Sequence, residues 1–191
     1  MNLPLDSQIQ LSAFLFLLSV GVILPVVRRE YLRRGKLNQL SALLQLVVWF
    51  SFHIFLGMVV WGDIWPPLSA FLPKHWFGGP FALLGLGLCL AGMGVFRSLN
   101  RITGREVNRL VITGIYRWTR NPQYTGYGLV ILGIVLGYWS ATAWLALPAY
   151  ALLAYATVRI EEEHLESVFG EEYRDYCRQV PRFLGWFGGT T

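Results

Sequence analysis

The residues best suited to chemistry lie in two polar segments, 114–126 and 159–173. The first combines arginine, tyrosine and asparagine with glycine, and the second is rich in glutamate. An apolar stretch between them is long enough to cross a membrane and return to the same face. We therefore expect both segments to meet at one end of a helical bundle, where a polar cofactor could contact a lipid-borne substrate.

The first segment predicts a helix start beside an anion-binding turn. Asn is a favoured N-cap and Pro is favoured at the first helical position, so Asn121 and Pro122 should begin a helix. Arg117 and Arg120 lie on the preceding turn, where free N–H groups, the helix dipole and guanidinium charge together favour an anion. Contact with lipid headgroups would use the same arginines, so both interpretations stay open.

In the second segment Arg159 lies at the membrane boundary, two positions before Glu161. A partly desolvated charge at this depth tends to be paired or functional. His164 could act as a general base, but a lone histidine in a charged helix is more often a surface residue, and we assign it no role.

An alternative for the second segment is the solvated face of an interfacial helix, and it is favoured for Glu163 and Glu166. In that arrangement three apolar side chains would face the membrane, namely Leu165, Val168 and Phe169.

The composition indicates an integral membrane protein. Of 191 residues, 54% are hydrophobic and 14% are charged, whereas soluble domains have about a quarter charged. Most of the apolar stretches approach the ~20 residues that a membrane-spanning helix needs. They cover residues 9–27, 40–61, 79–96, 122–137 and 141–158. We expect an all-α, polytopic fold with five transmembrane helices followed by interfacial helices on the cytoplasmic side.

The basic residues predict the topology. Fifteen of the sixteen lie at 28–36, 97–120 and 159–182, and Lys74 is the exception. The positive-inside rule then puts the N-terminus outside and the C-terminus in the cytoplasm, in a plasma or inner membrane. A cleaved signal peptide is disfavoured because residues 1–8 contain no Lys or Arg and no small-x-small site follows the first apolar stretch.

Several other classes of site are disfavoured. Basic loops beside a bilayer explain the net charge of +5 without nucleic acid. Cys89 and Cys177 are expected to stay unpaired, and no spacing suggests a metal site. The glycine pair at 85 and 87 lies in an apolar span and lacks the strand of a dinucleotide-binding loop. Close helix packing explains the glycines at 85, 87, 92, 94, 133 and 137.

The chain has no linker or repeat, which indicates a single domain over residues 1–191. Residues 1–109 hold three spans without a recognisable motif, and residues 110–183 hold both polar segments. The aromatic and proline-rich loop at 62–78 is typical of an interfacial segment with a structural role.

The two segments, LVITGIYRWTRNPQYTG at 110–126 and RIEEEHLESVFGEEYRDYCRQVPRF at 159–183, resemble the isoprenylcysteine carboxyl methyltransferase family. The resemblance implies a membrane-embedded methyltransferase that uses S-adenosylmethionine and holds it with the loops around the last two spans. One position departs from the pattern, because Asn121 stands where eukaryotic members usually have histidine. Asparagine can still hydrogen-bond a cofactor group, but it cannot carry charge or shuttle a proton.

The resemblance also implies roles for individual residues. Arg159 would orient an acceptor carboxylate, and Glu162, with His164 as the other candidate, would act as the base for an amine or thiol acceptor. The cofactor pocket would be formed by Leu110, Val111, Gly114, Tyr116, Arg120, Asn121, Pro122, Tyr124 and Glu161.

Three functions are compatible with these observations. The first is methyl transfer to a lipophilic acceptor entering from the membrane, such as an isoprenylcysteine-like carboxylate, another lipid, or a thiol or amine. The second is an NADPH-dependent reductase, because sterol reductases share a related motif. The third is a non-enzymic membrane scaffold with the same fold. The first is favoured.

Overall fold

The computed structural model describes residues 4–61, 75–95, 109–138 and 141–183, and its regular elements in these ranges are all helical. This confirms the expected all-α class. The α-helices are α1 (Leu5–Arg34), α2 (Gln39–Trp61), α3 (His75–Gly94), α5 (Pro122–Tyr138), α6 (Ala146–Phe169) and α7 (Glu171–Gln179). Two short 3₁₀ helices are η2 (Gly114–Arg117) and η3 (Ala143–Leu145).

Within the described ranges, four helical segments are long and apolar enough to cross a membrane, which makes this a multi-pass membrane protein. They cover Leu5–Arg34, Gln39–Val60, Trp76–Gly94 and Ala143–Phe169. The remaining apolar helix, α5, has 17 residues and a length of about 25 Å. It begins at Pro122 as expected, but it is shorter than a typical span, so a fifth crossing stays a prediction.

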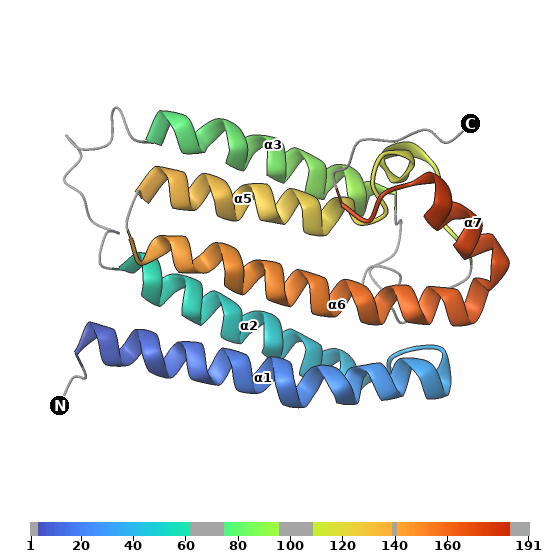
Figure 1. The fold of residues 1–191 in the computed structure, drawn as a ribbon, viewed down its shortest axis with the longest axis horizontal. Helices are drawn as coiled ribbons and strands as arrows, with labels where there is room; N and C mark the ends of the chain where they lie inside the picture. The colour runs from blue at the N-terminus through green and yellow to red at the C-terminus, as the bar shows by residue number, and fades with distance from the viewer. Residues whose placement is uncertain (1–3, 62–74, 96–108, 139–140, 184–191) are drawn as a thin grey trace.

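The long helices form two antiparallel pairs, α1 with α2 and α3 with α5, and α6 lies between the pairs (Figure 1). The N-terminal end of α5, the C-terminal end of α6 and α7 all lie at the same end of this bundle (Figure 1). The expectation that the two polar segments meet at one end is therefore confirmed.

Backbone contact between glycines holds α3 against α5. A Cβ atom added at Gly78 would clash with the backbone of Gly133, and one added at Gly85 would clash with the backbone of Gly126. Only glycine allows this approach, which is the small-residue packing that the sequence predicts for these two helices.

Two glycines of the predicted set lie elsewhere. Nothing described lies within 4 Å of a Cβ atom built at Gly87 or Gly94, so the expectation of close packing is wrong for these two. They lie on a different side of α3 from Gly85 and Gly92, which face α5.

Helix α6 continues without a break from the membrane segment into the second polar segment. The apolar stretch ends near Val158, but the helix runs to Phe169 and gives way to α7 at Gly170, where φ is +56°. Leu165 and Phe169 pack against the cluster formed by Tyr173, Tyr176 and Val180. The expectation that Leu165 and Phe169 face the membrane is therefore wrong, because α7 covers them.

Candidate active site

The segment after α7 passes directly against the start of α5. The backbone N–H of Arg120 donates to the carbonyl of Pro181 at 2.9 Å. The side-chain amide of Asn121 donates to the carbonyl of Arg182 at 3.0 Å, and the hydroxyl of Thr119 donates to the same oxygen at 3.3 Å. These bonds join the two motifs at the N-terminal end of α5.

A buried ion-pair cluster connects three segments at this junction. Glu162 is 9% exposed, and its Oε1 lies 3.3 Å from Nη1 of Arg120. Its Oε2 lies 2.8 Å from Nε and 2.7 Å from Nη2 of Arg182. The bond to Glu162 is also the main reason that the pKa of Arg182 is raised. A buried charge is stable only when it is paired with an opposite charge, and here the two guanidinium groups compensate the carboxylate of Glu162.

Glu161, the neighbouring residue, has a different environment. The Tyr124 hydroxyl donates to its Oε1 at 2.6 Å. The position of Tyr124 is fixed in turn by Tyr150, whose hydroxyl donates to the Tyr124 carbonyl, and by the ring of Trp49 at 6.0 Å. Within the described residues Glu161 forms no salt bridge, so its negative charge has a phenol as partner but no cation.

The loop before α5 supplies the next part of the site. Tyr116 is buried in η2, and its carbonyl accepts a hydrogen bond from the Tyr176 hydroxyl at 2.6 Å. Burial first, and then the negative charge of Glu161, raise the pKa of Tyr116. Gly114 has φ of +63°, a conformation that most other residues avoid. Leu110 packs against the α7 cluster instead, and Val111 is partly buried.

Arg159 lies away from these residues. It is exposed and has no ion pair or hydrogen bond within the described residues. Two positions separate it from Glu161, so the two side chains leave α6 in directions about 200° apart. The structure thus brings most of the predicted site residues together, namely Tyr116, Arg120, Asn121, Pro122, Tyr124, Glu161 and Glu162. It leaves Arg159 on the opposite face of α6.

His164 is buried, at 3% exposure, so the expectation of a surface histidine is wrong. Its ring stacks on Tyr31 with centroids 4.5 Å apart. Helix α1 continues to Arg34, seven residues past the apolar stretch that ends at Val27, and this extra length covers His164. The sequence contains no periodic signal that would have revealed this contact.

Arg182 is a second site residue that the sequence did not reveal. It lies within the second motif, at 159–183, but the sequence analysis assigned it no role. Besides contacting Glu162, its guanidinium lies 5.7 Å from the centroid of the Tyr155 ring. The signal that could have indicated a role for Arg182 was its position as a basic residue shortly after an amphipathic helix. Among the residues that the structure describes, no group of three His, Cys, Asp or Glu side chains could hold a metal ion.

Comparison with protein families matches residues 73–172, more than half of the chain, to the phospholipid methyltransferase family. The chain is 38% identical over 101 residues to the cobalt-zinc-cadmium resistance protein CzcN of Cupriavidus metallidurans, which covers 52% of this chain and 46% of that protein. It is 30% identical over 143 residues to protein-S-isoprenylcysteine O-methyltransferase of Rattus norvegicus, covering 66% of this chain and 46% of the rat protein.

A third relative is methanethiol S-methyltransferase of Mycobacterium tuberculosis, at 35% identity over 77 residues, 38% of this chain and 29% of that protein. The chain spans about half the length of the first curated relatives that it matches. No solved structure matches it. The family match includes α3, α5 and α6 and the start of α7, and so contains most of the site described above. The chain belongs to the phospholipid methyltransferase family, and its relatives include the isoprenylcysteine O-methyltransferases.

Proposed function

We propose that this protein is a membrane methyltransferase that uses S-adenosylmethionine to methylate a lipophilic acceptor. The observation that carries the proposal is the carboxylate of Glu161, which Tyr124 orients and which has no cationic partner among the described residues. S-adenosylmethionine carries a sulfonium and an ammonium group. A partly buried anion at the junction of the two motifs suits such a cation.

Two hydrogen-bond donors near the start of α5 also fit the cofactor. Arg120 Nε and Gln123 Nε2 are buried and have no hydrogen-bond partner within the described part of the chain. An unpaired buried donor costs about 1–3 kcal/mol, which a ligand with acceptor oxygens would recover. We infer that Glu161 holds the cationic groups, and that these donors and the N-terminal end of α5 hold the carboxylate.

The chemistry asks for positioning more than for a reactive side chain. Bound S-adenosylmethionine would supply an activated methyl group, and in-line displacement needs no enzymic nucleophile. The residues of this chain would align the two reactants and provide a field suited to a disappearing positive charge. Tyr124 holds Glu161 in place, and the rings of Trp49 and Tyr116 exclude water from the junction.

For the acceptor we propose two possibilities that relatives suggest. A carboxylate acceptor, as in the isoprenylcysteine O-methyltransferases, would need a cation beside the cofactor, and Arg159 is not placed to supply it because it lies on the opposite face of α6 from Glu161. A thiol acceptor, as in methanethiol S-methyltransferase, would have to lose a proton, and Glu162 is the nearest candidate base.

We propose that the end of the bundle carrying α7 faces the cytoplasm and that the N-terminus is outside, with α5 as a fifth crossing. The distribution of basic residues supports this orientation, because the arginines at the end of α1 and those of α7 lie at the same end of the bundle (Figure 1). A C-terminal reporter active only outside the cytoplasm would contradict it.

The function is tested by equilibrium binding of S-adenosylmethionine and of NADPH to detergent-solubilised protein. We expect saturable binding of S-adenosylmethionine that Glu161→Gln weakens and Glu172→Gln, on the exposed face of α7, leaves unchanged. Binding of NADPH alone would indicate a reductase. A folded protein that binds neither compound would indicate a scaffold.

A further inference from the structure

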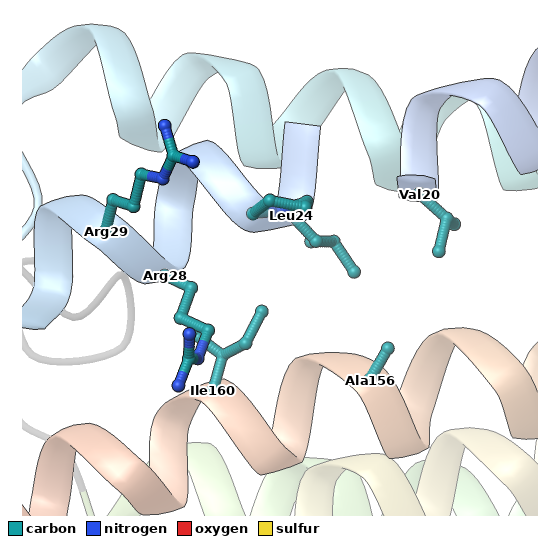
Figure 2. A pocket seen from close by; sticks show the side chains of 7 residues that line it. Val20, Leu24, Arg28, Arg29, Ala156 and Ile160 are labelled. Atoms are coloured by element: carbon teal, nitrogen blue, oxygen red, sulfur yellow. The ribbon is translucent and has the colours of Figure 1, made fainter. Parts of the chain in front are cut away.

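A groove of about 390 Å³ lies between α1 and α6 (Figure 2). Apolar side chains line most of it and arginines lie at one end. The lining residues are Val20, Leu24, Pro25, Arg28 and Arg29 of α1, and Ala156 and Ile160 of α6. Arg28 extends toward α6, and Arg29 points away from it (Figure 2).

Like a single lipid molecule, the groove is apolar over most of its length and charged at one end. Helices α1 and α6 run in the same direction, so both walls change from apolar to charged toward the same end of the bundle. From Val20 to Arg28 the rise along α1 is about 12 Å, close to half of the ~30 Å hydrocarbon core. The apolar part therefore matches one leaflet, and the basic end falls at headgroup depth.

The charges at the headgroup end favour an anion. Arg28 Nε lies 2.6 Å from Glu163 Oε2, and the two side chains are 51% and 33% exposed. An ion pair this open to solvent is worth little, so a phosphate can replace Glu163 at small cost. Arg29 has no ion pair within the described residues and adds a second positive charge at the same end.

We propose that this groove binds one anionic phospholipid, with its phosphate at Arg28 and one acyl chain between α1 and α6. Ala156 and Ile160 leave α6 at about 140° and 100° from Glu161. The bound lipid therefore contacts other positions of α6 than Glu161, and it links α1 to the helix that carries Glu161 and Glu162.

The proposal is tested by native mass spectrometry of the full chain in detergent, titrated with phosphatidylglycerol or phosphatidylcholine. We expect one phosphatidylglycerol to bind in preference to phosphatidylcholine. Arg28→Gln should weaken its binding by about tenfold, the loss expected when a charged hydrogen bond is removed. Arg33→Gln removes the same charge from the exposed last turn of α1 and should have little effect.

Two further variants test the groove itself. Ala156→Trp fills its apolar part and should abolish the preference for phosphatidylglycerol, whereas Leu152→Trp, at an exposed position one turn earlier, should not. If Ala156→Trp does not fold, Ala156→Leu replaces it. Glu163→Gln frees Arg28 and should strengthen phosphatidylglycerol binding.

Equal binding of the two lipids would overturn the proposal, and so would equal losses in Arg28→Gln and Arg33→Gln. Unchanged phosphatidylglycerol binding in Ala156→Trp, or weaker binding in Glu163→Gln, would also overturn it. None of these outcomes depends on methyltransferase activity.

Discussion

Arg182 holds Glu162 through two nitrogens, with Nε at 2.8 Å and Nη2 at 2.7 Å from the same carboxylate oxygen. The two residues are separated in sequence by the end of α6 and by all of α7, so this contact fixes where the segment after α7 lies. Arg120 approaches the other oxygen of Glu162 from the start of α5. One carboxylate thus connects three parts of the site, and the planar guanidinium of Arg182 is suited to a contact of this kind.

We predict that Glu162→Ala destabilises the protein by about 3 kcal/mol, because it leaves two partly buried guanidinium groups without a counter-charge. Thermal unfolding in detergent measures the loss. Glu171→Ala is the matched control, since Glu171 pairs with Arg174 and Arg178 on the exposed surface of α7 and such pairs contribute little to stability. Equal losses in both variants would show that the Glu162 cluster has no special stabilising role.

We predict that Tyr124→Phe and Glu161→Gln each weaken S-adenosylmethionine binding, with at least one of them losing about 1–3 kcal/mol. Tyr124→Phe removes the donor that orients Glu161, and Glu161→Gln removes the charge. Tyr155→Phe removes a hydroxyl from an exposed position of α6 and keeps the ring beside Arg182, so it serves as the control. Unchanged affinity in both folded variants would place the cofactor elsewhere.

We predict that Arg159→Lys keeps the fold, the cofactor affinity, kcat and kcat/KM. Arg159 is exposed and leaves α6 about 200° from Glu161, so an acceptor group that meets a cofactor held at Glu161 is out of its reach. Steady-state kinetics and cofactor binding measure the two effects separately. A fall in kcat and kcat/KM together for an anionic acceptor would mean that Arg159 orients the acceptor, and loss of cofactor binding would mean that it lies beside the cofactor.

We predict that His164→Phe leaves the melting temperature unchanged or raises it. Both ring nitrogens of His164 are buried without a hydrogen-bond partner among the described residues, and an aromatic ring of similar size keeps the stacking on Tyr31. Removing an unsatisfied polar group relieves its desolvation cost. His164→Ala, which leaves a cavity, should lower the melting temperature. A fall in both variants would show that the imidazole nitrogens have partners.

The sequence predicted those features that depend on hydropathy and local helix signals. The start of α5 at Pro122 follows from Asn-Pro chemistry. The meeting of the two polar segments follows from the apolar stretch between them. The lengths of α1 and α6 were not predictable in this way, because hydropathy reports contact with lipid and both helices continue as polar helices beyond the apolar stretch.

Contacts between distant polar residues were also beyond the sequence. Nothing in the spacing of Arg120, Glu162 and Arg182 indicates that they share one cluster, because their meeting depends on how α7 folds back along α6. The burial of His164 depends in the same way on the last turns of α1. The residue types of the site were recognisable, whereas their pairing required the tertiary structure.

The shortness of α5 has a consequence for where water and lipid meet. Glycine contacts at Gly126 and Gly133 fix α5 alongside α3, so it cannot slide independently to compensate for its length. At about 25 Å it is shorter than a hydrocarbon core of ~30 Å, a negative hydrophobic mismatch. With α5 as the proposed fifth crossing, the bilayer must thin around this helix, or water must reach below the headgroups at the polar end where Asn121 lies. In the proposed methyltransferase, a water-soluble cofactor and a chain-bearing acceptor would then meet at a depth that neither reaches on its own, and we expect the activity to be sensitive to membrane thickness.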